Sequence, residues 1–279
     1  MISLDQWANI RTAYSDQPNF RNYPDVVNAA WQCLGPRGLD RDSVKAMRIP
    51  VGSFHPRIWR GIFELDTAHC YSPVDPRSAY GGSYVGSNVA ISSIFDSIEG
   101  LFLYLEPANE NLPAFGHRIR EMLILACTEV ESAWRSVLEV NGKNQDRYTT
   151  KDYCHLIEPL RLKDWTLTLT NYPDLGTFSP FSTWSESSPT SSLPWYDGYN
   201  AVKHHREGNF KHATLGSLIN AAAALHVMQA AQFGPEIYDR FFGTEESPFY
   251  TTKHPVHDFS ELYAPDFIAE ERMSPTPYW

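Results

Sequence analysis

The chain has 279 residues, of which 42% are hydrophobic and 14% aromatic, and its net charge is −10. That length suits one large domain or one domain with extensions, and the 20% of charged residues is not the composition of a disordered chain. The acidic balance argues against generic binding of polyanions, because non-specific nucleic-acid affinity comes from neutralising phosphates. An acidic net charge does not exclude a local basic pocket.

Residues 1–84 are predicted to be an irregular or mixed N-terminal region. Within it, PDVVNAAWQCLG predicts a short helix that starts at Pro24 and stops at Gly35. Near its end, GGSYVGS has the glycine spacing of a phosphate-binding loop, but Ser87 stands where that motif requires lysine. We therefore expect these glycines to form a turn that leads into a helix at Asn88.

Residues 85–243 are predicted to form a helical bundle, so the expected fold class is mainly α. Apolar residues recur at helical spacing in two long segments, one ended by Pro107 and one closed by Asn141 and Gly142. A third, shorter helix is expected in TKDYCHLIEPLRL. The alanine-rich residues 213–233 are apolar on every side, as is typical of a central bundle helix.

A long insertion rich in Ser, Thr and Pro, residues 164–194, separates the third predicted helix from the last one. Its TLTLT segment alternates with period two and predicts a short strand. Residues 244–279 form a tail with seven acidic and two basic residues. We expect this tail to pack on the bundle through its aromatic side chains.

The four cysteines show no CxxC spacing, so neither a zinc knuckle nor a redox motif is expected, and Cys127 is predicted to be a buried free thiol. His254 and His257 lie three residues apart, but no cysteine or carboxylate set completes a metal site around them. Neither a metal nor a cofactor is therefore predicted. The chain also lacks a secretory leader pattern and an apolar run of about 20 residues, which predicts a reduced, soluble, cytoplasmic protein with no membrane partner.

The segment WYDGYNAVKHHREGNF, residues 195–210, concentrates the side chains that can do chemistry. A histidine such as His204 can act as a general base, while Lys203 and Arg206 can hold a phosphate. Asn200 lies four residues before His204 and so falls on the same helical face. Alternatively, cations clustered at a helix end complement the helix dipole or neighbouring acids.

A carboxylate on the second long helix is a candidate partner for this motif. Glu129 lies on the flank of the apolar stripe, beside Val130. It either faces the histidines of the motif across the bundle and supports them, or it is a boundary carboxylate paired with a base.

The order of elements, with two long helices, a polar N-x-x-x-H motif and an alanine-rich helix, resembles the HEPN superfamily of helical bundles. The motif itself, Tyr199 to Arg206, is similar to the YNxVKHxR-type motif of a group of uncharacterised bacterial proteins. Active HEPN members use R-x4-6-H, in which histidine and arginine from two protomers meet at a dimer interface and cleave RNA without a metal. Tyr199 stands here where the family places arginine. The resemblance implies catalytic roles for Asn200, His204 and Arg206 and substrate contacts from Tyr199, Lys203 and His205.

Two functions of different classes follow from this reading. The first is a metal-independent endoribonuclease, or an RNA- or nucleotide-binding component, of a stress or phage-defence system, acting as a homodimer. The second is a catalytically inert helical module for protein–protein interaction or self-association. The acidic balance and the aromatic tail favour the second function. Metal-dependent hydrolysis is disfavoured because no ligand set clusters in the sequence.

Overall fold

The computed structural model describes residues 47–62, 75–204, 206–238, 245–266 and 273–279, without the side chains of residues 204, 206 and 207. The chain divides into two compact units. One comprises the described parts of residues 1–54, 60–71 and 257–274. The other comprises those of residues 55–59, 72–256 and 275–279. The helix predicted at residues 24–35 lies outside the described residues.

The smaller unit is held by short backbone pairings. Strand β1 (Ser53–Phe54) pairs with β5 (Ser274–Pro275), where the amide of Ser274 donates to the carbonyl of Gly52 at 2.7 Å. Ile62 forms a parallel bridge with Tyr263. The 3-10 turn η9 (Phe259–Glu261) begins at a capping box formed by Asp258 and Glu261, which satisfies amides that would otherwise lack partners.

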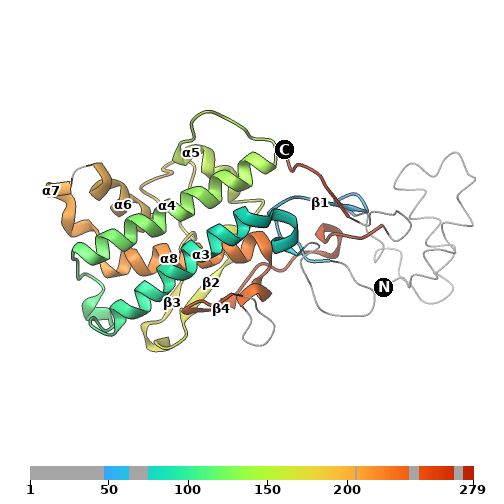
Figure 1. Cartoon of the computed structure of the whole chain (residues 1–279). Helices are drawn as coiled ribbons and strands as arrows, with labels where there is room; N and C mark the ends of the chain where they lie inside the picture. Colours follow the sequence, from blue (N-terminus) through green and yellow to red (C-terminus); the bar gives the residue numbers. More distant parts are fainter. Residues whose placement is uncertain (1–46, 63–74, 205, 239–244, 267–272) are drawn as a thin grey trace, which may run out of the picture. The chain divides into compact units, whose positions relative to one another are not determined.

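The larger unit is mainly α, as predicted. Its longest helices are α3, α4 and α8. Helix α8 packs against α3, α4 and α6, as can be followed in Figure 1. The helices are α3 (Pro76–Phe102), α4 (His117–Val140), α5 (Thr150–Tyr153), α6 (Pro194–His204), α7 (Arg206–Asn209) and α8 (Leu215–Phe233). Short 3-10 turns are η3 (Asn109–Asn111), η4 (Cys154–Leu156), η5 (Leu162–Asp164), η6 (Pro173–Leu175), η7 (Phe210–His212) and η8 (Pro235–Tyr238).

Helix α8 is the centre of the core, which confirms the prediction from its composition. Nearly all of its side chains are buried, and its four consecutive alanines, Ala221 to Ala224, let neighbouring helices approach closely. The apolar stripe of α4 is confirmed as well, because Leu123, Val130 and Trp134 are fully buried. Burying these two surfaces against each other is the main source of stability in such a bundle.

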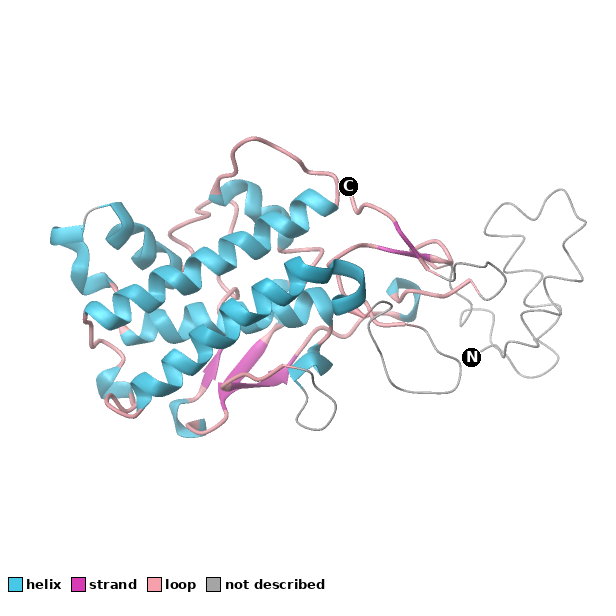
Figure 2. Cartoon of the chain, viewed as in Figure 1, coloured by secondary structure: helices cyan, strands magenta, loops and turns pink. Residues whose placement is uncertain are grey.

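The predicted strand in the insertion is β2 (Thr166–Leu169), the middle strand of an antiparallel sheet ordered β3-β2-β4. Its neighbours are β3 (Thr177–Phe178) and β4 (Phe249–Lys253), and Figure 2 shows the sheet beside the helices. Leu167 and Leu169 point into the core, while Thr166 and Thr168 are partly exposed. The period-two alternation thus matches a sheet with one buried face.

Two expectations about the helices are wrong. The GGSYVGS stretch is not a turn ahead of a helix, because α3 begins at Pro76 and contains it. The helix is interrupted at Gly81, whose φ of 50° and ψ of −133° a side-chain-bearing residue rarely adopts. The third predicted helix is also shorter than expected. After α5 and η4 the chain meets Pro159, and Arg161 then takes a left-handed conformation with φ 46°.

Candidate functional site at the end of α6

Helix α6 carries the motif singled out in the sequence. Pro194 suits its first position, where a missing amide hydrogen costs nothing. Trp195, Tyr196 and Tyr199 are 3%, 4% and 1% exposed, so they anchor this segment on the bundle. Lys203, in the last turn, is exposed. The helix therefore buries an aromatic face and presents its polar end to solvent.

The buried face of α6 meets a carboxylate of α4. The hydroxyl of Tyr196 donates to Glu131 Oε1 at 2.6 Å, and the ammonium of Lys203 lies 3.9 Å from Glu131 Oε2. Lys203 Nζ also donates to the hydroxyl of Tyr199 at 2.7 Å. Glu131 thus links the first and the last turns of α6 to the middle of α4, and fixes where the exposed end of α6 lies.

The charge states in this network follow from burial and hydrogen bonding. Burial raises the pKa of Tyr196, and the hydrogen bond to Glu131 raises it further. Burial likewise raises the pKa of Tyr199, although the bond from Lys203 acts in the opposite direction. The bond to Tyr199 raises the pKa of Lys203. At neutral pH both phenols are therefore protonated and Lys203 is a cation.

Asn200, His204, His205 and Arg206 are the other predicted site residues of this segment. Asn200 is half-buried, and its Nδ2 donates to the carbonyl of Tyr196 at 3.1 Å, one turn back in the same helix. His204 is the last residue of α6 and Arg206 the first of α7, but their side chains lie outside the described part of the structure. His205 lies outside it entirely.

Among the described side chains, the carboxylate that contacts α6 belongs to Glu131 and not to Glu129. Glu129 is half-buried, and burial raises its pKa. Sequence reasoning missed Glu131 because both carboxylates border the apolar stripe, one on each flank. Glu131 lies four residues after Cys127 and three before Trp134, both fully buried. That spacing marks it as a boundary residue, but only packing shows which flank α6 covers.

Close packing at Gly198 joins α6 to the elements that follow it. A Cβ atom on Gly198 would lie 2.9 Å from the carbonyl oxygen of His212, so only glycine lets η7 come this close to α6. Asn209 Nδ2 also donates to the carbonyl of Ala201 at 3.2 Å. The end of α6, α7 and η7 therefore form one compact corner of this unit.

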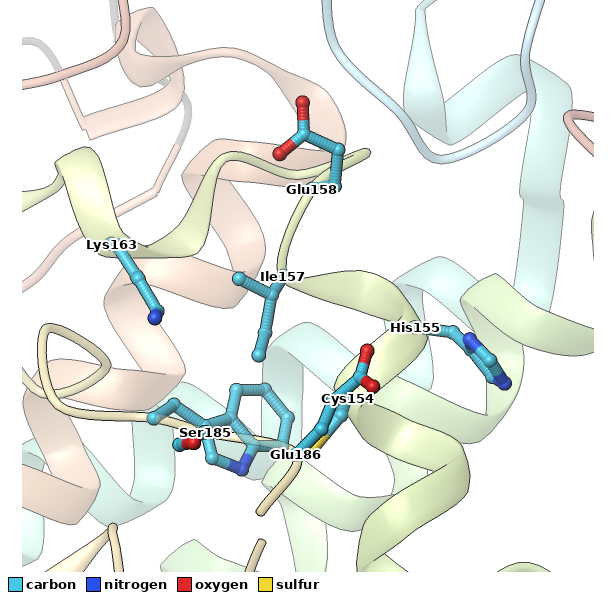
Figure 3. A pocket seen from close by; sticks show the side chains of 8 residues that line it. Cys154, His155, Ile157, Glu158, Lys163, Ser185 and Glu186 are labelled. Atoms are coloured by element: carbon cyan, nitrogen blue, oxygen red, sulfur yellow. The ribbon is translucent and has the colours of Figure 1, made fainter. Parts of the chain in front are cut away.

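A separate open hollow of about 390 Å³ lies beside η4, as Figure 3 shows. Cys154 borders it, yet its thiol donates to the carbonyl of Thr150 and burial raises its pKa to about 11, so it is not a nucleophile at neutral pH. The imidazole of His155 points away from Cys154 and Lys163 (Figure 3). The hollow is lined by Cys154, His155, Ile157, Glu158, Lys163, Trp184, Ser185 and Glu186.

The described residues hold neither a metal site nor a reactive thiol. They contain no group of three or more His, Cys, Asp or Glu side chains placed to hold a metal ion. Cys127 and Cys154 are both free and buried, as predicted for Cys127. None of the described helices combines the length and the apolar character needed to cross a membrane.

Comparisons with known proteins give no relative. The sequence matches no family model, and neither the curated proteins nor the solved structures contain a significant match.

Proposed function

We propose that the end of α6 is the functional site of a cytoplasmic HEPN-like protein that binds or cleaves RNA or nucleotides. It would act as a homodimer in a stress or phage-defence system, as the resemblance of its motif implies. His204 serves as general base, and Lys203, His205 and Arg206 contact the phosphate or the rest of the substrate. Asn200 and Tyr199 are positioning groups, and Glu131, rather than the predicted Glu129, supports the site through Tyr196 and Lys203.

The observation that carries this proposal is the way Lys203 is held. Its ammonium is exposed at the end of α6, yet the buried Tyr199 hydroxyl and the Glu131 carboxylate restrain it. A fixed cation next in sequence to a histidine suits phosphate chemistry, because the cation can neutralise charge while the imidazole takes up a proton. Tyr199, being buried, takes part through Lys203 and not by touching the substrate.

The test is RNA cleavage by the purified protein and by a His204→Ala variant, each incubated with total RNA. A general base typically contributes at least about 100-fold, so His204→Ala should abolish detectable cleavage while its thermal melt stays nearly unchanged. His155→Ala replaces an exposed histidine elsewhere and should cleave like the wild type. If the extent of RNA cleavage is the same for the wild type and His204→Ala, the nuclease hypothesis is wrong.

The second candidate function is an inert helical module that associates with itself. It is favoured by apolar side chains on the outer face of α3, where Val85 is 50% exposed and Val89 66% exposed. Leu103 and Tyr104, just beyond α3, are 81% and 90% exposed. Val85 and Val89 lie one turn apart on α3, and adjoining exposed apolar side chains favour an interaction surface.

A further inference from the structure

The corner formed by the start of α4 and η7 gathers aromatic rings and cations. The ring of Phe210 lies 5.7 Å from that of Phe115, edge to face, and 4.8 Å from the imidazole of His117. The guanidinium carbon of Arg120 lies 5.8 Å from the centre of the Phe210 ring. Lys211 follows directly in the chain and is exposed.

The backbone segments that carry these groups are held in place before any ligand arrives. Phe115 forms an antiparallel bridge with Thr214, and the amide of Leu215 donates to the carbonyl of Ala114 at 2.8 Å. The segment before α4 is thus tied to the start of α8, and the packing at Gly198 ties η7 to α6. A rigid surface loses little conformational entropy when it binds a ligand.

Phe115, His117 and Lys211 are exposed at this corner, whereas Arg120 and Phe210 are half-buried. Phe115 is 53% exposed, although a ring of that size is normally buried. No carboxylate of the described residues lies within ion-pair distance of Arg120 or Lys211, whereas Arg118 is paired with Glu121 at 3.7 Å. Arg120 Nε is moreover buried without a hydrogen-bond partner. In a chain of net charge −10, this corner therefore combines two cations without an acidic partner among the described residues with the exposed ring of Phe115.

We infer that this corner, defined by Phe115, His117, Arg120, Phe210 and Lys211, binds a segment of single-stranded RNA. Phe115 supports a stacked base, and Arg120 and Lys211 contact the adjacent phosphates. Single-strand binding combines aromatic stacking with backbone neutralisation, and both kinds of group are present here. An acidic peptide would use the cations but leave Phe115 without a role. The inference rests on the proposed function, because the bound strand would lead to the motif at the end of α6.

The experiment measures binding of a short, fluorescently labelled single-stranded RNA in the His204→Ala background, so that cleavage cannot consume the probe. Phe115→Ala should weaken binding by about tenfold, because one stacked base contributes about 1–3 kcal/mol. Lys211→Glu should weaken it similarly and reduce the dependence on salt by about one phosphate contact. A duplex of the same length should bind less tightly, because its bases are already stacked on one another.

Matched controls come from β4, which Figure 1 shows far from α7. Tyr250→Ala removes an exposed ring, 64% accessible, and Lys253→Glu reverses an exposed cation. Both should bind the RNA like the parent, and the melting temperatures of all four variants should stay close to that of the parent.

Three outcomes would overturn the inference. They are absence of RNA binding, equal binding by the corner variants and the controls, and equally strong competition by poly-glutamate, which would indicate an acidic protein partner. The cleavage test decides the proposed function separately. If Phe115→Ala loses binding but the wild type cleaves no RNA, only the nuclease hypothesis is wrong. If the wild type cleaves RNA but Phe115→Ala binds it normally, only the inferred binding surface is wrong.

Discussion

His226 is a polar side chain buried in the middle of α8, only 1% exposed. Its Nδ1 and Nε2 each lie 2.8 Å from a hydroxyl, those of Ser247 and Thr251, and its ring stacks on Tyr238 at 4.1 Å. A neutral imidazole donates with one nitrogen and accepts with the other, so two hydroxyls satisfy it fully. Burial lowers the pKa of His226 to about 3, and the ring is neutral in the folded protein.

This arrangement predicts acid sensitivity. The folded-state pKa lies below the ordinary value, so as pH falls the unfolded chain binds the proton first. The stability that neutral His226 contributes is complete above about pH 6.5 and is lost as pH falls toward 3. Urea unfolding should therefore show, at pH 4, a loss on the order of 3 kcal/mol from this residue relative to pH 7.

His226→Asn isolates that contribution. The variant should be less stable than wild type at pH 7, because it cannot make both hydrogen bonds, but its stability should fall less between pH 7 and pH 4. His155→Asn, at an exposed position, should behave like wild type. The same pH dependence in His226→Asn and wild type would contradict this account.

Residue by residue, the sequence predicted part of the candidate site. The aromatic anchors of α6 could be predicted, because apolar rings at helical spacing are driven into the core wherever the helix packs. The partnership of Glu131 with Tyr196 and Lys203 could not, because those residues lie 65 and 72 positions away along the chain. A contact at that distance depends on which flank of α4 is covered.

At the scale of elements, β4 differs most from the prediction. Residues 249–253 belong to the acidic tail in sequence, yet they form an edge strand of the sheet next to β2. Phe249 is 3% exposed and lies against the rings of Phe95, Phe178 and His226, whereas Tyr250 points outward. This part of the tail is therefore a structural strand of the larger unit.

Neighbouring substitutions in β4 test that role. Phe249→Ala should destabilise the protein by about 3 kcal/mol or more, because it removes a buried ring and leaves a cavity. Tyr250→Ala should change the free energy of unfolding by less than about 0.5 kcal/mol, since that side chain is on the surface. Chemical denaturation measures both. Similar values for the two variants would mean that β4 does not belong to the core.

At the scale of the whole molecule, the exposed apolar face of α3 bears on the oligomeric state. If Val85 and Val89 meet a second copy, the mass measured by light scattering should rise with protein concentration. Val89→Lys should then keep the protein monomeric, because it would bury an unpaired cation in the interface. Val256→Lys alters another exposed valine, 81% accessible, and should leave association unchanged. If the wild type stays monomeric at every concentration, the self-association hypothesis is wrong.

The sequence by itself determined the mainly α character of the larger unit, the stripe of α4, the central place of α8 and the strand β2. These features follow from periodicity and composition, which depend only on residues close together in the sequence. Only the tertiary structure decided that the tail supplies β4, that Glu131 is the carboxylate beside α6, and that Phe210 meets Phe115 and Arg120 at one corner. These are contacts between segments distant in sequence, and they depend on how helices and strands pack, which no local pattern specifies.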